Sequence, residues 1–349
     1  MTVVKRLCSS RTHIGDRCRD EGRDVRQLAI GIDIGGSKIA AGVVDRQAKI
    51  IARHAVVGHH CASPEHVLAC VEQAYEALLG QPGVRREELA GVGLGFAGHV
   101  NGKAGVVITS SNLPGWDHVP LRDIVRERLH VPVVLENDCK LNGLAEHMYG
   151  AGQGVDNMCY VTISTGYGLA IILDGKLYTG HIGTAGEIGH TVVEVGGALC
   201  SCGKRGCLMA YTAGIGLARM ARAKIEGGAD TILGEMAGGD PASLTGRLIA
   251  EAARKGDAVA RELIATAGYY AGVGLSTVVQ VVNPELIVIG GGLCHIGPMF
   301  MEPCTRGLRE NVHPTLYESV RIVPWKLGAD SGVLGAAAKV FVTCEEEAW

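Results

Sequence analysis

The feature that most constrains the fold is a pattern that occurs twice. A strand-like segment at 28–34 runs into a glycine-rich turn and a second apolar segment at 39–45. The same order of strand, small polar turn and strand returns at 158–165 and 169–178. Because each copy is followed by helical spacing and a further strand, a duplicated α/β architecture with a mixed sheet in each half is predicted. A ligand cleft is expected between the two halves.

Periodicity and turn signals predict the individual elements. Segments 28–36, 39–45 and 49–57 are three strands with short connections, which indicates an antiparallel meander. Ser63–Gly80 has the Ser-Pro opening and terminal glycine of a helix. The apolar stretch 266–282 is too short and too polar for a bilayer span and is expected to be a buried helix. Further strands are expected at 90–98, 131–135 and 286–292, and helices at 121–130 and 141–149.

The length of 349 residues suits two domains of about 150 residues each. We expect them at 27–139 and 140–349, with the last helix free to pack back on the first domain. Residues 1–26 mix both charge signs and lack the apolar core of a secretory signal, so a disordered extension is expected there. Without an export signal or a membrane span, the expected compartment is the cytoplasm.

Charge and composition narrow the class of partner. The 33 basic and 36 acidic residues leave a formal charge of -3, which argues against binding to nucleic acid or to a membrane surface. Aromatic residues make up only 4%, so stacking platforms for bases are scarce, whereas the 51 glycines favour close backbone approach. A small molecule is the expected partner.

The first chemical motif lies between the first two strands. Gly35 and Gly36 allow positive φ and close approach to a ligand. Ser37 and the backbone amides around Lys38 can donate to phosphate oxygens, and Asp33 can hold a hydrated Mg²⁺ beside them. The alternative is an ordinary glycine-rich hairpin turn, and the segment is not a Walker A loop.

Two further glycine-rich segments also indicate a site for phosphate or nucleotide. The turn at 164–168 occupies the equivalent place in the second half, and two matched turns facing one cleft are more informative than one. Gly290–Gly292 end an apolar strand and offer a flat surface to a base or ribose, unless they form a plain strand-to-helix turn. Gly93–Gly98 match the dinucleotide fingerprint by letter, but the polar segment that follows lacks the required helix, so NAD binding is not expected.

Glu136-Asn137-Asp138 closes a strand and precedes a helix. A carboxylate at the end of such a strand can accept the proton of a substrate hydroxyl, and Asn137 can bond a neighbouring hydroxyl. The alternative is structural, because Asn and Asp before a helix commonly cap its free amides. The residue pattern alone leaves both possibilities open.

The strongest local signal is His190 followed by Cys200, Cys202 and Cys207. Three thiolates and one imidazole form a tetrahedral structural zinc site, which has no open position for a catalytic water. Buried free cysteines or a redox pair are the alternatives. The second ring nitrogen of His190 is free to contact a substrate, and Glu187 is expected on the same wall unless it is a solvated loop carboxylate.

Taken in order, these motifs resemble the ROK family of sugar kinases and sugar-responsive repressors. The matching segments are DIGGSK, SNLPGW, ENDC, STGYG with GTAGEIGH, CSCGKRGC, VIGGG and GADSGVLGAA. The resemblance extends from about Leu28 to Val340. It implies an actin-like two-domain ATPase fold, of the ribonuclease H-like class, with sugar and ATP bound in the cleft between the domains.

The resemblance also implies roles for single residues, with in-line transfer of the γ-phosphoryl group of ATP. Asp138 becomes the catalytic base. The implied substrate contacts are Gly98, Asn112, Asn137, Asp138, Glu187 and His190. The implied nucleotide contacts, with Mg²⁺, are Asp33, Gly35, Gly36, Ser37, Lys38, Thr165, Gly166, Gly291 and Gly292. The implied zinc ligands are His190, Cys200, Cys202 and Cys207.

Two positions depart from the family pattern. Met209 stands where the family usually has a glutamate that bonds hydroxyls at the anomeric end of the sugar, and a thioether cannot replace that charged acceptor. Tyr167 stands in the phosphate turn where a smaller aliphatic residue is usual. The loss at Met209 favours an unusual polyol, a cyclitol or carbasugar phosphorylated on its exocyclic hydroxymethyl group. C7-cyclitol kinases of aminocyclitol antibiotic biosynthesis are the precedent within the family.

Other functions remain as alternatives. Glucokinase or N-acylhexosamine kinase is the runner-up activity. A sugar-responsive repressor is disfavoured, because the 27 residues before Leu28 are too few for a winged helix-turn-helix. A dead kinase retained as a binding module is disfavoured because the base, both phosphate turns and the zinc ligands are all present. By resemblance, a homodimer or homotetramer is expected.

Overall fold

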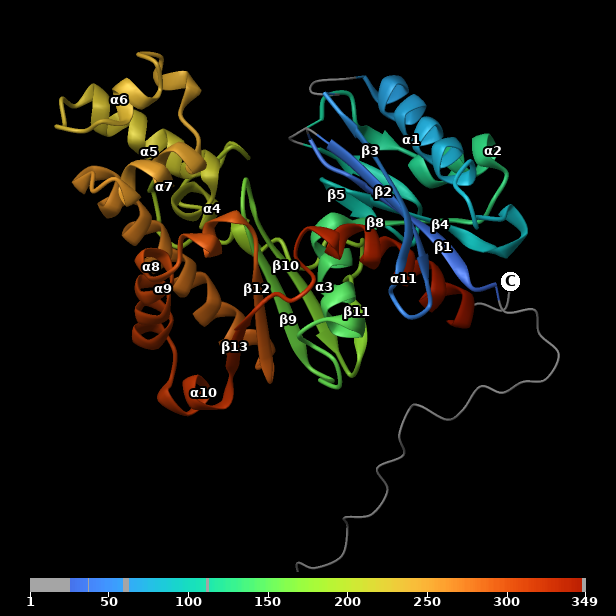
Figure 1. The fold of residues 1–349 in the computed structure, drawn as a ribbon. Helices are drawn as coiled ribbons and strands as arrows, with labels where there is room; N and C mark the ends of the chain where they lie inside the picture. Colours follow the sequence, from blue (N-terminus) through green and yellow to red (C-terminus); the bar gives the residue numbers. More distant parts are fainter. Residues whose placement is uncertain (1–25, 37, 59–62, 111–112, 347–349) are drawn as a thin grey trace, which may run out of the picture.

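The computed structural model describes residues 26–36, 38–58, 63–110 and 113–346. Two five-stranded sheets stand side by side, each with helices on its outer face, and two helices lie between them (Figure 1). The extension expected at 1–26 lies outside the described residues except for Arg26. No helix among the described residues is both long and apolar enough to cross a membrane.

The first sheet begins with the predicted antiparallel meander, and its later strands run parallel to the first. In spatial order its strands are β3 (Ile50–Val57), β2 (Lys38–Asp45), β1 (Leu28–Ile34), β4 (Leu89–Phe96) and β8 (Val133–Asn137). Two helices, α1 (Pro64–Leu79) and α2 (Leu121–Leu129), cover its outer face (Figure 1). The Ser63 hydroxyl caps α1 and Pro64 opens it, as the Ser-Pro signal predicts.

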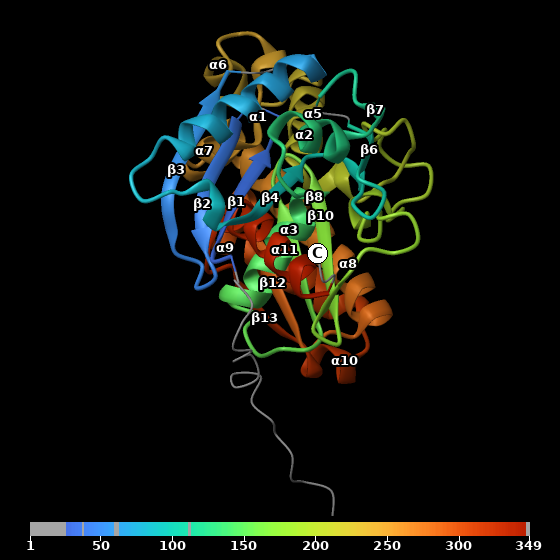
Figure 2. The same cartoon turned by 90° about the vertical axis from the view of Figure 1, so that its right-hand side faces the viewer.

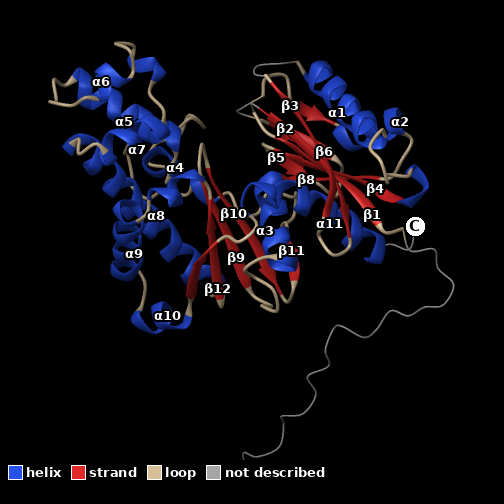
Figure 3. Ribbon diagram, viewed as in Figure 1, coloured by secondary structure: helices blue, strands red, loops and turns tan. Residues whose placement is uncertain are grey.

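The second sheet repeats the first strand for strand. Its order is β11 (Lys176–Tyr178), β10 (Tyr167–Leu173), β9 (Met158–Ile163), β12 (Leu286–Gly290) and β13 (Arg321–Pro324). As in the first sheet, the three strands that come first in the chain, β9, β10 and β11, form an antiparallel meander. The later strands β12 and β13 run parallel to β9. The predicted duplication is therefore confirmed at the level of topology, and the red strands of Figure 3 show the two sheets flanking the central helices.

Helices fill the outer side of the second sheet and form the largest core of the molecule. The longest, α8, runs for 25 residues and contains the predicted buried stretch 266–282. These helices are α4 (Met209–Thr212), α5 (Gly214–Glu226), α6 (Leu233–Met236), α7 (Gly246–Arg254), α8 (Ala258–Val282), α9 (Pro298–Asn311) and α10 (Pro314–Ser319).

Between the two sheets lie α3 (Asp138–Tyr149) and α11 (Ser331–Glu346), which pack on each other (Figure 2). The α3 helix rests on β9 and β10, whereas α11, from the end of the chain, rests on β1 and β4. Glycine makes this close approach possible, because a Cβ at Gly93 would lie 1.9 Å from the carbonyl oxygen of Ala336. The glycines that imitate a dinucleotide fingerprint thus include a helix-docking residue.

A small third sheet extends from the end of β4 and borders the space between the halves. It consists of β5 (His99–Asn101), β6 (Val106–Thr109) and β7 (Asp117–Val119). The segment after Gly98 is therefore a strand and not the helix that a dinucleotide site requires, which agrees with the expectation against NAD binding.

Candidate active site

A cavity of about 550 Å³ lies between the two halves and collects most of the predicted site residues. The predicted residues that line it are Gly35, Gly36, Gly98, Asn137, Asp138, Thr165, Gly166, Glu187, His190 and Cys202. Two predicted residues, Ser37 and Asn112, lie outside the described part of the chain. Lys38 is exposed at the start of β2 and lines neither this cavity nor a second cavity, described below, that adjoins it.

Asn137 and Asp138 stand at the junction of β8 and α3. The Asn137 side chain accepts a hydrogen bond from the amide of Lys140, 3.1 Å away, and so caps α3. The helix therefore begins at Asp138, three residues earlier than the predicted 141, because that cap satisfies its first turn. Asn137 therefore caps α3 and also lines the cavity.

Asp138 is the first residue of α3 and is held by two donors. Its Oδ1 accepts from the Cys139 amide at 2.8 Å and from Nδ2 of Asn137 at 3.0 Å. Burial raises the pKa of Asp138 to about 6, the Cys139 amide opposes that shift, and the charge of Glu187 adds to it. A carboxylate with this pKa is ionised at neutral pH yet basic enough to accept a hydroxyl proton.

Asp33 is the last residue but one of β1; it lines neither cavity, but its carboxylate is close enough to Asp138 for the two charges to interact. Burial raises the pKa of Asp33 to about 7, the charge of Asp138 adds to that shift, and Lys38 opposes it. A Cβ at Gly332, in the first turn of α11, would lie 2.5 Å from Oδ2 of Asp33. Two neighbouring carboxylates that resist ionisation suit a site for a divalent cation.

The two glycine-rich turns are tight hairpin turns that open on the same cavity. In the first half, the amide of Gly35 donates to the carbonyl of Lys38 at 3.0 Å and joins β1 to β2. In the second half, the amide of Ser164 donates to the carbonyl of Gly166 at 2.9 Å and joins β9 to β10. The hairpin alternative and a place in the ligand cavity are therefore compatible.

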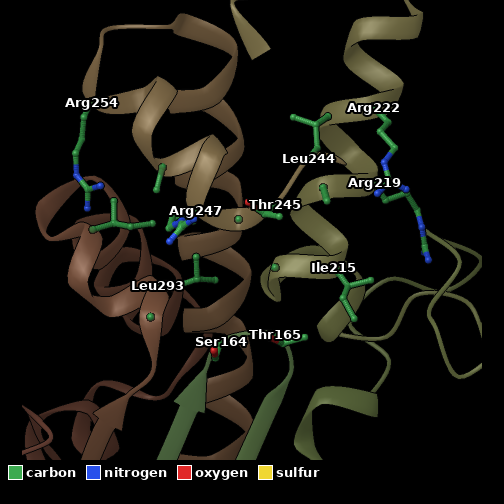
Figure 4. A pocket seen from close by; sticks show the side chains of 16 residues that line it. Ser164, Thr165, Ile215, Arg219, Arg222, Leu244, Thr245, Arg247, Arg254 and Leu293 are labelled. Carbon is green, nitrogen blue, oxygen red and sulfur yellow. The ribbon is translucent and has the colours of Figure 1, made fainter. Parts of the chain in front are cut away.

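A second cavity, of about 570 Å³, continues from the first through Ser164 and Thr165. Apolar side chains line it between α5 and α7, with Ile215 on one side and Leu293 on another, and Arg247 reaches in from the start of α7 (Figure 4). Gly292 borders this cavity, whereas Gly291, with φ 95°, packs against the backbone of Ile163. Of these two predicted nucleotide contacts, only Gly292 lines the cavity, whereas Gly291 packs inside the protein.

The predicted zinc ligands come together in one loop. Sγ of Cys202 lies 3.7 Å from Sγ of Cys207, and Sγ of Cys200 lies 3.8 Å from Nδ1 of His190. All four ligand atoms lie within 4.8 Å of one another. With bonds of roughly 2.3 Å, a tetrahedral zinc thiolate site has edges of about 3.8 Å, so the side chains fit the ion.

His99 is a cavity residue that the sequence motifs do not reveal. Its Nε2 lies 3.2 Å from Oε2 of Glu187, and the hydrogen bond to Glu187 raises the pKa of His99. His99 and Glu187 belong to different halves of the chain, and only the hairpin after β4 brings them together. No local spacing could have indicated the pair.

The two departures from the family pattern have different surroundings. Met209 lines the first cavity, and a Cβ at Gly166 would lie 3.7 Å from its Sδ. Tyr167 also borders this cavity, but its hydroxyl is buried in the core of the second half, where it donates to the carbonyl of Ala271 in α8 at 3.1 Å. Tyr167 therefore anchors the glycine-rich turn of the second half to α8, which supplies the structural explanation for that departure.

Comparison with known proteins agrees with this geometry. The ROK family profile matches residues 29–341. The chain is 34% identical to the glucokinase of Streptomyces coelicolor over 314 residues, 89% of this chain and 96% of that protein. It is 30% identical to the xylose repressor of Caldicellulosiruptor bescii over 252 residues, 72% of this chain and 62% of that protein. It also resembles the crystal structure of a ROK family glucokinase from Streptomyces griseus in complex with glucose and AMPPNP, with a TM-score of 0.74 and 34% identity, covering 89% of this chain and 98% of that one.

Proposed function

The chain belongs to the ROK family, and from that membership we propose that it phosphorylates the exocyclic hydroxymethyl group of a hexose-like polyol. It is an ATP-dependent phosphotransferase that acts on a sugar hydroxyl, and it has the actin-like two-domain fold of the ROK kinases. The observation that carries the finer proposal is Asp138, a partly buried carboxylate at the start of α3 that faces a cavity shared by both halves.

In the proposed mechanism Asp138 acts as the general base. Both described hydrogen bonds go to Oδ1, which leaves Oδ2 to receive the proton of the acceptor hydroxyl. The hydroxyl oxygen attacks the γ-phosphorus of ATP, the bond from that phosphorus to the bridging oxygen breaks, and ADP leaves with the electron pair. The amides of the two hairpin turns, around Gly35 and Thr165, are proposed to hold the phosphates.

The second cavity is proposed to receive the adenosine of ATP. It adjoins the phosphate turn at Thr165, and its walls include the apolar side chains of Ile215 and Leu293, which suit the faces of a base (Figure 4). The predicted nucleotide contacts Gly292 and Thr165 both line it. Replacement of Ile215 by aspartate should raise the KM for ATP and leave the KM for the acceptor unchanged.

Two metal ions are proposed, and their roles differ. Mg²⁺ is proposed at Asp33, where it would screen the charge of the phosphates beside two carboxylates whose pKa values are raised. Zinc is proposed at His190 and the three cysteines, where a closed four-ligand site orders the loop at 190–207. Nδ1 of His190 lies beside Sγ of Cys200, so His190 would hold zinc through that nitrogen and would leave the other ring nitrogen to face the acceptor.

Among acceptors we propose a cyclitol or carbasugar, with a place in aminocyclitol antibiotic biosynthesis. Met209 supports this choice, because it lines the cavity where the family pattern expects a hydroxyl-binding glutamate. Glucose is the second candidate and is supported by the glucokinase relatives. We also keep a homodimer or homotetramer as a proposal, which light scattering would test.

The test is a panel of acceptors incubated with ATP and Mg²⁺. It contains glucose, N-acetylglucosamine, N-acetylmannosamine and cyclitols that carry a hydroxymethyl group, and product formation is followed by mass spectrometry. A kcat/KM for a cyclitol well above that for glucose supports the proposal. Full activity on glucose with none on cyclitols overturns the choice of acceptor but leaves the kinase assignment in place.

A further inference from the structure

The pair formed by His99 and Glu187 connects the two halves of the molecule inside the acceptor cavity. Nε2 of His99, at the start of β5, lies 3.2 Å from Oε2 of Glu187 in the second half. Their side chains are 38% and 39% exposed, and both residues line the cavity. The His99 ring also faces that of His190 edge-on, with ring centroids 6.3 Å apart. The pair therefore spans the cleft where an acceptor can reach it.

The backbone around the pair is fitted closely, so the contact is more than a meeting of two surface side chains. The buried Nζ of Lys140 donates to the carbonyl of Gly183 at 2.5 Å. A Cβ at Gly183 would lie 2.6 Å from the carbonyl oxygen of Val100 in β5. The segment that leads to Glu187 is thus seated on β5 just beyond His99.

Within its own loop, Glu187 has little to fix its side chain. It occupies the N-cap position of the short 3₁₀ helix at Ile188–His190, but its carboxylate makes no capping hydrogen bond there. A glutamate side chain has several rotamers, and ordering it when a ligand arrives costs conformational entropy. The hydrogen bond from His99 restricts those rotamers before binding.

We infer that His99 is a positioning residue that holds Glu187 across the cleft in the orientation that receives an acceptor hydroxyl. This inference rests on the proposed function, which makes Glu187 an acceptor contact. It adds a determinant of acceptor affinity that none of the sequence motifs contains. Because Met209 offers no charged group to the acceptor, the orientation of Glu187 carries more of the recognition in this chain.

The test is steady-state kinetics of His99→Leu and His99→Gln with the best acceptor from the panel. Leucine removes the donor, and the KM for the acceptor should rise about 10-fold, the effect of losing one charge-assisted hydrogen bond. The kcat and the KM for ATP should stay within about threefold of the wild type, because His99 touches neither the phosphates nor Asp138. Glutamine keeps an N–H donor at similar reach and should restore most of the acceptor affinity.

Two controls separate positioning from general damage. His66→Leu, on the exposed side of α1, should leave all constants unchanged. In the double variant His99→Leu/Glu187→Gln, the KM should be no worse than in Glu187→Gln alone, since His99 acts through that carboxylate. Wild-type acceptor KM in His99→Leu, failure of glutamine to rescue, or additive effects in the double variant would overturn the inference alone. A wild-type protein that phosphorylates no polyol would contradict the proposed function and this inference together.

Discussion

At the scale of single residues, the proposed base Asp138 also affects the stability of the fold. The partly buried carboxylate of Asp138 is harder to ionise than one in water, because burial and the nearby charge of Glu187 raise its pKa. The ionised group therefore destabilises the empty protein at neutral pH. The residue that is proposed to accept the proton thus lowers the stability of the folded protein.

Asp138→Asn tests this trade-off. The proposed loss of the base should lower kcat by about 10²- to 10⁴-fold. In urea unfolding at pH 7.5, the same variant should be more stable than the wild type by about 1 kcal/mol, because a neutral amide replaces the strained charge. The difference in unfolding free energy between the variant and the wild type should be smaller at pH 4.5, where Asp138 of the folded wild type is protonated. Asp174→Asn, in the exposed β10–β11 turn, is the control and should alter neither quantity.

The pH dependence of turnover follows from the same carboxylate. With the pKa of Asp138 raised from 3.8 to about 6, the base is ionised above pH 6 and protonated below it. The value of kcat/KM for the acceptor should therefore fall about tenfold for each pH unit below 6. A pH profile recorded at saturating ATP checks this expectation, and a profile flat down to pH 4.5 would exclude Asp138 as the base.

Met209 offers a gain-of-function test of acceptor choice. Met209→Glu restores a charged acceptor to the cavity wall and should raise kcat/KM for glucose about 10- to 100-fold relative to the wild type. The ratio of glucose to cyclitol turnover, measured in competition, reports the change. Met209→Gln is the matched variant without the charge, and an equal effect of both would argue against a role for the carboxylate.

At the level of elements, local signals in the sequence were enough for most of the fold. The meander, the capped helix α1, the strand before Asp138 and the two glycine turns all follow from patterns within a few residues. The helix α3 begins three residues earlier than predicted, because the Asn137 side chain caps it while Asn137 also lines the cavity. The placement of the domain boundary near residue 139 stays a prediction.

The contact between His99 and Glu187 could not be predicted from local signals in the sequence. Its members belong to elements of different halves, and their approach depends on how β5 folds back after β4. A contact of that kind is set by tertiary packing and leaves no periodicity in the sequence. The clustering of the four proposed zinc ligands, in contrast, was predictable, because three of them lie within one short loop.

The loop at 190–207 supports a prediction about metal content. Cys207→Ser should abolish the proposed zinc, measured by mass spectrometry of the metal, and should speed proteolysis within 190–207. The KM for the acceptor should rise about 10-fold or more, because His190 loses the ion that orients its ring. Cys70→Ala, a buried cysteine in α1 outside the group, should keep the metal and the wild-type KM.

On the scale of the whole molecule, the docking of α11 on the first sheet leaves no room for an added carbon at Gly93. Gly93→Ala would force a Cβ to within 1.9 Å of the Ala336 carbonyl oxygen, which is backbone and cannot rotate away. We expect a loss of about 3 kcal/mol or more in the free energy of unfolding, measured with urea. Gly234→Ala, whose nearest neighbour is 4.0 Å away, should leave the stability unchanged within about 0.5 kcal/mol.

The same helix sets the order in which the protein can be completed during synthesis. The strands β1 and β4 are made early, yet the helix that covers their inner face is the last element of the chain. At about 5 to 20 residues per second, β1 waits roughly 15 to 60 seconds on the ribosome for α11. Throughout that interval the nascent chain carries an uncovered apolar sheet face, which is the kind of surface that chaperones bind.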